Sequence, residues 1–161
     1  MAAVDDLDAF IDRYDPQVAA QARAALARLR KRLPGAYELV YNYNHALVIA
    51  FGASDKGYEA VFSIALYPRW ITLFFGQGAK LPDPQGLLQG SGKQVRGIRL
   101  ADAKNLDSAA IKSLMKAALA EQPIPKSTGG HLIIKSNSAA KAPRRGKSNS
   151  KPLRQQRASQ V

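Results

Sequence analysis

The apolar patterning of this chain ends at Gln122, and the balance of charge changes at the same point. Residues 1–122 contain 15 basic and 12 acidic residues, a net charge of +3, whereas residues 123–161 contain nine basic residues and no acidic one. A segment so polar and charged buries too little apolar surface to order itself. The sequence therefore predicts one folded domain over residues 1–122 and a basic, largely disordered tail over residues 123–161. Within that tail, the apolar stretch His131–Ile134 could add a short edge strand or dock transiently.

Cysteine is absent, which excludes disulfides, thiolate metal ligands and cysteine nucleophiles. The longest apolar run, Ala46 to Phe51, is far shorter than the roughly 20 residues that span a bilayer. The acidic N-terminus lacks the apolar core of a signal peptide. We therefore expect a cytoplasmic protein with no membrane partner, and the sequence leaves its oligomeric state open.

Apolar residues recur at helical spacing in three segments, residues 4–14, 16–33 and 107–122. The second helix should begin at Asp15-Pro16, because Asp is a good N-cap and Pro is tolerated at the first helical position. Five segments have the composition of strands: residues 37–41, 46–51, 60–67, 70–75 and 95–100. This order predicts a two-layer α+β fold, in which two N-terminal helices and one C-terminal helix cover a mainly antiparallel sheet of about five strands.

Polar aromatic residues gather just before the second predicted strand, at Tyr41, Tyr43 and His45. Tyrosine hydroxyls and an imidazole can fix a small polar molecule, so this turn is a candidate binding site. The alternative is a structural turn whose tyrosines cover the sheet. His45 has no general-base partner in the sequence, so we do not expect it to be catalytic.

The segment Gly90–Arg96 has the chemistry of an anion site. Ser91 and Gly92 would supply hydrogen bonds, and Lys93 and Arg96 would neutralise charge. It is not a nucleotide-binding P-loop, because Gln94 occupies the position where that motif needs Ser or Thr. The alternative is a purely structural loop.

Trp70 follows the predicted hairpin turn Pro68-Arg69 and is a third candidate. Its ring could stack on a ligand beside a cation, or it could simply cover the edge of the sheet. No nucleophile–base pair and no metal triad is visible in the sequence, so we predict no catalytic residue and no cofactor.

Four acidic residues recur at steps of three and four along the first helix. Asp5, Asp8 and Asp12 could bind a hard cation weakly, although an exposed acidic helix face is the simpler interpretation. Basic residues recur through the tail, at Lys141, Arg144, Arg145, Lys147, Lys151, Arg154 and Arg157. They predict salt-sensitive, non-specific affinity for nucleic acid. The tail has no aromatic residue, so base stacking would add nothing there.

Three segments carry a resemblance to a known family: the hairpin Ala60–Trp70, the loop Gly76–Pro84 and the segment Leu87–Arg96. Together they resemble the YdhG-like bacterial domains of unknown function over roughly residues 5–120. The resemblance implies a small α+β fold on a curved sheet and no established enzymatic activity. One branch of that family has been proposed as a frataxin-like iron chaperone, a role that would need surface carboxylates.

The leading prediction is a non-enzymatic binding domain for a small anionic or polar ligand, with its site where the Tyr41–His45 turn meets the Gly90–Arg96 loop. The charge would come from Lys93 and Arg96, and the walls would come from aromatic rings, those of Tyr41, Tyr43 and Trp70. Two alternatives remain: a nucleic-acid-associated protein acting through its tail, and a weak iron-binding chaperone acting through its acidic first helix.

Overall fold

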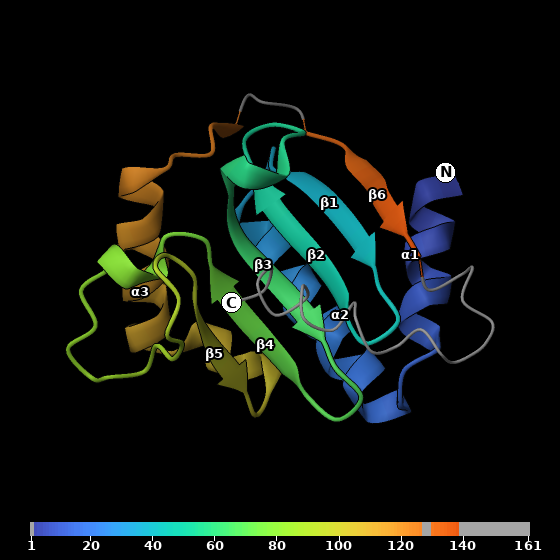
Figure 1. Ribbon diagram of the computed structural model, residues 1–161, viewed down its shortest axis with the longest axis horizontal. Coiled ribbons are helices and arrows are strands. Elements are labelled where there is room, and N and C mark those ends of the chain that lie inside the picture. The colour runs from blue at the N-terminus through green and yellow to red at the C-terminus, as the bar shows by residue number, and fades with distance from the viewer. Residues whose placement is uncertain (1, 127–129, 139–161) are drawn as a thin grey trace.

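A six-stranded sheet forms the centre of the computed structural model, which describes residues 2–126 and 130–138 (Figure 1). The described chain has three α-helices, α1 (Ala2–Asp12), α2 (Pro16–Arg32) and α3 (Ala109–Glu121). The strands are β1 (Tyr37–Asn42), β2 (Leu47–Gly52), β3 (Ala60–Leu66), β4 (Ile71–Phe75), β5 (Arg96–Leu100) and β6 (Leu132–Asn137). Short 3₁₀ turns are η1 (Gly57–Glu59), η2 (Gly78–Lys80) and η3 (Ala103–Asp107). The predicted α+β class is confirmed.

The strands lie in the order β5-β4-β3-β2-β1-β6. Neighbouring strands from β1 to β5 are antiparallel, as short links require, and only β6 pairs in parallel, with β1. The five expected strands are therefore present within a residue or two of their expected bounds. The sheet has six strands rather than the expected five or so, because Leu132–Asn137 extends it at one edge.

All three helices lie on one side of the sheet, with α2 behind the central strands, α3 toward the β5 edge and α1 beside β6 (Figure 1). Alternate side chains of each strand face them, so that one buried row crosses the sheet through Val40, Ile49, Ile64 and Leu73. Leu26 and Leu29 of α2 complete this core and are fully buried. No helix of the described residues covers the opposite face.

The helix starts follow local capping chemistry. Asp15 accepts a hydrogen bond from the backbone N–H of Gln17 at 3.1 Å, directly before Pro16, as the sequence predicts. Ser108 caps α3 in the same way by accepting from the N–H of Ile111. Among the described residues, no helix is long and apolar enough to cross a membrane.

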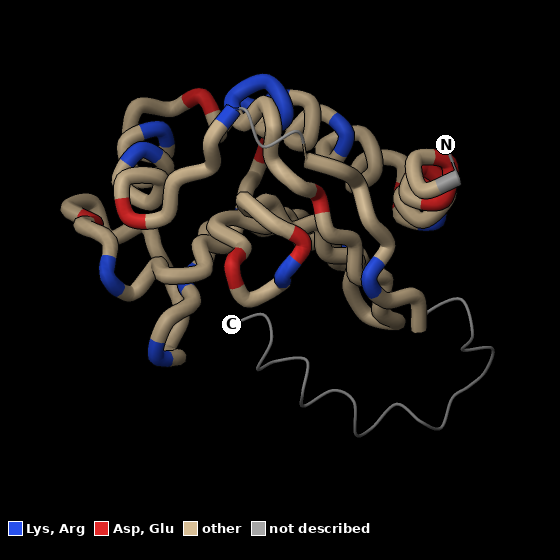
Figure 2. Tube along the Cα trace, turned by 90° about the horizontal axis from the view of Figure 1, so that it is seen from above, with Lys and Arg blue, Asp and Glu red and all other residues tan. Residues whose placement is uncertain are grey.

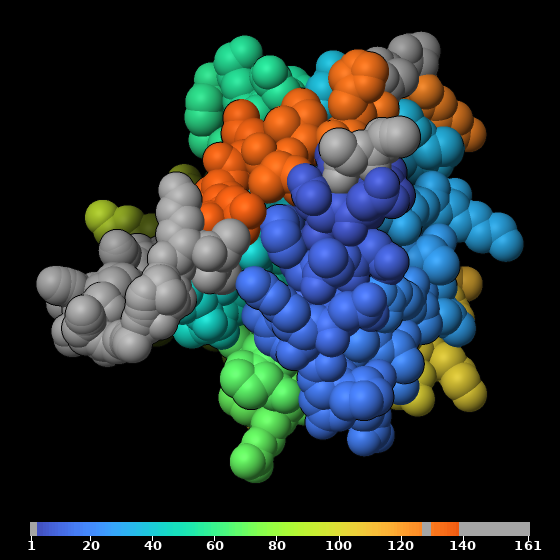
Figure 3. Space-filling view, turned by 90° about the vertical axis from the view of Figure 1, so that its right-hand side faces the viewer, coloured from blue at the N-terminus to red at the C-terminus, as the bar shows by residue number. Residues whose placement is uncertain are grey.

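The strand β6 shows that the sheet continues past residue 122. Figure 3 shows α1 packed along β6 on this side of the molecule. Asn42, which is 2% exposed, donates from Nδ2 to Oδ1 of Asn137 at 2.8 Å and so joins β1 to β6. Gly130 lies against the backbone of Ala36, where a side chain would overlap with it. Of the two possibilities for residues 131–134, an edge strand or transient docking, the structure has the edge strand, over Leu132–Asn137. The basic residues predicted to bind nucleic acid, from Lys141 to Arg157, lie outside the described residues.

Replacing Asn42 by Ala should lower the free energy of unfolding by about 1 kcal/mol, because the change removes a buried side-chain hydrogen bond. Urea denaturation measures this loss, and amide hydrogen exchange should show that it is concentrated in β6. The matched control is Asn44→Ala, since Asn44 is exposed in the following turn. Equal stability of the two variants would contradict the assigned role of Asn42.

Candidate functional site

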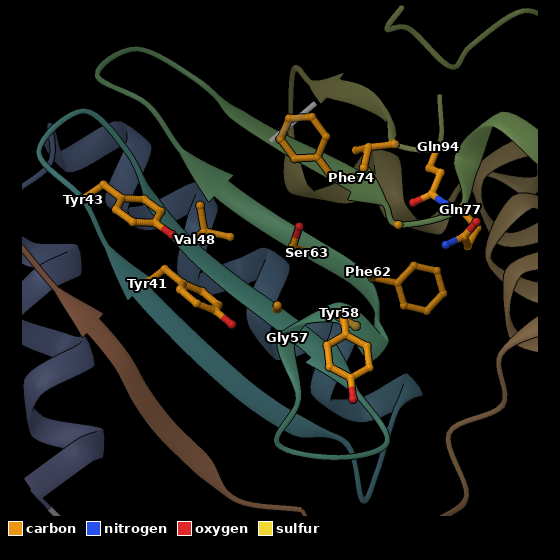
Figure 4. A pocket seen from close by; sticks show the side chains of 14 residues that line it. Tyr41, Tyr43, Val48, Gly57, Tyr58, Phe62, Ser63, Phe74, Gln77 and Gln94 are labelled. Atoms are coloured by element: carbon orange, nitrogen blue, oxygen red, sulfur yellow. The ribbon is translucent and has the colours of Figure 1, made fainter. Parts of the chain in front are cut away.

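A cavity of about 360 Å³ lies on the face of the sheet that the helices leave uncovered (Figure 4). Strands β1 to β4 form its floor, and two loops form its sides: residues 53–59 after β2 and residues 76–95 after β4. The lining consists of Tyr41, Tyr43, Val48, Ala50, Gly57, Tyr58, Ala60, Phe62, Ser63, Phe74, Gly76, Gln77, Gln94 and Val95. This volume falls in the range of about 300–1,000 Å³ that is typical of small-molecule sites.

One wall of the cavity is aromatic. Tyr41 and Tyr43 are two residues apart at the end of β1 and lie on the same side of the chain, with ring centroids 6.1 Å apart and an interplanar angle of 21°. His45 continues the row, with its ring 6.0 Å from that of Tyr43 and nearly parallel to it at 10°, but it does not line the cavity. The two tyrosine rings give the cavity an aromatic surface that suits a ring-containing ligand.

Gly57 determines how closely the 53–59 loop approaches this wall. A methyl group on its Cα would overlap with the hydroxyl of Tyr41, so with any larger residue here the Tyr41 side chain would have to move. The next residue, Tyr58, is 79% exposed at the rim of the cavity. An exposed aromatic ring beside a cavity is available to contact a ligand.

Phe74 shapes the opposite side of the site. A Cβ built on Gly97 would stand 2.8 Å from the Phe74 ring, so this ring lies directly over the backbone of β5. The absence of a side chain at Gly97 therefore lets Phe74 lie flat at the side of the cavity. Gln77 and Gln94 lie at this end, and Tyr41 and Tyr43 lie at the other (Figure 4).

The polar groups of the cavity are neutral. They are hydroxyls and side-chain amides, those of Tyr41, Tyr43, Tyr58, Ser63, Gln77 and Gln94. None of them forms a side-chain hydrogen bond within the part of the chain that the structure describes. Burial raises the pKa of Tyr41 and of Tyr43, and the neighbouring Tyr41 raises that of Tyr43 further. Both phenols therefore remain protonated donors at neutral pH.

The two segments singled out in the sequence meet at this cavity. Tyr41 and Tyr43 line it from one segment, and Gln94 and Val95 line it from the other. The four loop residues expected to contact the ligand, Ser91, Gly92, Lys93 and Arg96, do not line it.

The guanidinium of Arg96 bonds to its own loop. Its Nη1 donates to the carbonyl oxygens of Gly92 at 2.7 Å and Val95 at 2.8 Å. Ser91 and Lys93 are exposed at the end of the same loop. The loop is therefore held in shape by one of the cations that was expected to bind the ligand.

Trp70 lies apart from the cavity lining. The guanidinium carbon of Arg99 is 4.0 Å from the centroid of the indole, and the ring of Tyr67 is 5.5 Å away. The cation beside Trp70 is thus supplied by β5 rather than by Arg69 of the hairpin. These contacts stabilise the end of the sheet.

Several lining residues are not among those predicted from the sequence, namely Tyr58, Ser63, Phe74, Gln77 and Gln94. Ser63 carries a signal that could have been used, because it is the one polar residue in the apolar strand β3 and alternation places it on the uncovered face. The two glutamines carry no such signal, because their position depends on how the 76–95 loop folds back onto the sheet.

A second cavity, of about 530 Å³, lies between α1, α2 and the β1–β6 edge. Figure 2 shows acidic residues gathered on α1 beside it. Arg23 forms ion pairs with Asp8 at 2.6 Å and Asp12 at 2.9 Å, so these carboxylates join α1 to α2. Asp5 is exposed at the edge of the same cavity. Within residues 2–126 and 130–138, no group of three potential metal-ligating side chains comes together.

The chain was compared with models of known families, with curated proteins and with solved structures, and none of the three comparisons found a match. The resemblance to YdhG-like domains therefore stays a prediction. The geometry of the cavity is the evidence from which a function can be inferred.

The two cavity tyrosines should titrate above pH 10, the ordinary pKa of a phenol, because burial opposes formation of phenolate. The ultraviolet absorbance of phenolate during alkaline titration measures this. Tyr43→Phe should remove one late-titrating group from the folded protein, and in urea all remaining tyrosines should titrate together near pH 10. If Tyr43→Phe instead removes a group that titrates near pH 10, Tyr43 is solvated and the prediction is wrong.

Proposed function

We propose that this chain is a non-enzymatic binding domain whose site is the cavity on the uncovered face of the sheet. The site takes the uncharged, ring-containing part of a small polar ligand. The observation that carries this proposal is the lining itself, which combines an aromatic wall with six neutral polar side chains that are not bonded to the rest of the described chain.

The neutrality of the lining favours a polar ligand group over an anionic one inside the cavity. An anion placed there would lose its hydration and would meet no charged side chain, and such desolvation is costly. A neutral heterocycle or amide avoids that cost, because the hydroxyl of Ser63 and the amides of Gln77 and Gln94 can replace the hydrogen bonds it makes with water.

The shape of the site supports a flat ligand group. Tyr41 and Tyr43 place rings at one end, Phe74 places a ring at the other, and the exposed ring of Tyr58 stands at the rim. Flat rings gain most from such surroundings, since stacking and edge contacts add about 0.5–1.5 kcal/mol per aromatic pair to the burial of apolar area.

Blocking the cavity should abolish binding of ring compounds. The full-length protein would be screened by ligand-observed NMR against uncharged rings, for example uracil, adenine, nicotinamide and indole. Ser63→Phe places a large side chain on the cavity floor and should remove the signals of every compound that binds. Gln94→Leu should weaken binding of hydrogen-bonding rings about threefold to tenfold, the value of one hydrogen bond.

The matched control is Gln89→Leu. Gln89 lies in the same loop and is exposed, but it does not line the cavity. Its backbone pairing with Gly97 does not involve the substituted side chain. If no ring compound binds the wild-type protein, or if Ser63→Phe, shown to be folded by circular dichroism, binds as the wild type does, the proposed site is wrong.

A further inference from the structure

Unpaired cations surround the neutral cavity. Lys56 and Lys93 are exposed and directly precede the lining residues Gly57 and Gln94 in the sequence. Neither lysine forms an ion pair with a described carboxylate.

Two further cations lie at the rim. Nζ of Lys135 donates to the carbonyl oxygen of Asp55 at 2.9 Å. This hydrogen bond places the positive charge of a β6 residue at the 53–59 loop. Arg96 directly follows the lining residue Val95, and it uses Nη1 for its own loop while its charge remains unpaired within the described residues.

The arginines of α2 differ from these cations, because they are paired with carboxylates. All five ion pairs of the described chain use arginines of α2, namely Arg23, Arg28, Arg30 and Arg32. Their partners are carboxylates of α1, β1 and η3, so these four arginines are locally balanced. The cations beside the cavity have no such carboxylate partner among the described residues.

Rim acids reduce this charge without cancelling it. Asp55 and Glu59 lie in the same loop as Lys56, and Glu59 accepts a hydrogen bond from the hydroxyl of Ser54. The carboxylate of Asp83, in the other loop, accepts from two backbone N–H groups of that loop. In and beside these loops, the four cations thus lie among three carboxylates, while the side chains that line the cavity carry no charge.

We propose that the ligand is a nucleotide, with its base in the cavity and its phosphate at the cationic rim. This inference rests on the proposed function and adds the identity of the ligand to it. A nucleobase is a flat neutral ring with donors and acceptors at its edge, which the amides of Gln77 and Gln94 can pair, and its faces fit the aromatic wall. The phosphate stays in solvent, where Lys56 and Lys93 attract it without a desolvation cost.

The test compares ligands that differ only in the phosphate. Dissociation constants for uridine and uridine 5′-monophosphate, and for adenosine and adenosine 5′-monophosphate, are measured by NMR titration of the full chain at low salt. The phosphate should tighten binding about fivefold or more in at least one pair, and raising the salt concentration should remove that gain because the cations are exposed.

Variants separate the rim cations from cations on the helical side of the sheet. The double variant Lys56→Gln and Lys93→Gln should abolish the gain from the phosphate and leave nucleoside binding unchanged. The control double variant, Lys112→Gln and Lys116→Gln, removes the same charge from α3 on the other side of the sheet and should keep the gain. If the control variant loses the gain equally, or if each nucleotide binds no more tightly than its nucleoside, the nucleotide assignment is wrong.

Failure of this inference is distinguishable from failure of the proposed function. Uncharged rings that bind in a manner sensitive to Ser63→Phe, without any effect of phosphate, would leave the cavity a binding site and reject the nucleotide. The nucleotide can be free or one unit of a single strand. A short single-stranded oligonucleotide that binds more tightly than the mononucleotide, with the gain still sensitive to Ser63→Phe, identifies the strand as the source, and equal affinity identifies the free nucleotide.

Discussion

The helices cover only one face of the sheet, and the rest of this structure depends on that constraint. Three helices bury one face, and α2 supplies most of the contact through a stripe that includes Leu26 and Leu29. The other face must then be closed by loops and by its own side chains. Because the loops at residues 53–59 and 76–95 close it only at the sides, a hollow is left between them, and that hollow is the candidate site.

Two glycines shape this hollow, because a residue without a side chain lets a neighbouring loop or ring approach the backbone closely. Gly57 lets a loop backbone contact the Tyr41 hydroxyl, and Gly97 lets the ring of Phe74 lie over β5. Both contacts are long-range in the sequence, so neither can be inferred from a local pattern. The tyrosine wall depends on the first contact, since the loop at Gly57 borders the space in which the Tyr41 hydroxyl lies.

Local physics made most of the fold predictable. Periodicity located all three helices and five strands, and Asp15-Pro16 marked the start of α2, because these signals act within one element. The strand β6 was harder to place, since Leu132–Asn137 is stabilised by pairing with β1 and by the distant Asn42. For the site, the sequence indicated the tyrosine turn and the correct second loop. Within that loop the prediction chose the charged residues, because Lys93 and Arg96 look chemically distinctive, whereas the fold places the neutral Gln94 and Val95 along the cavity.

The separation of neutral lining from charged rim follows from the cost of burying charge. A lysine on the cavity floor would lose its hydration and find no carboxylate there, so cations near the site are stable only where their heads reach water. On the helical side the same cost is met differently, because the guanidinium of Arg30 is paired with the largely buried carboxylate of Glu38 at 2.8 Å. That pair and its neighbours engage four carboxylates with the arginines of α2. The loop lysines Lys56 and Lys93 have no such partner among the described residues, so they are available to attract a phosphate from solution.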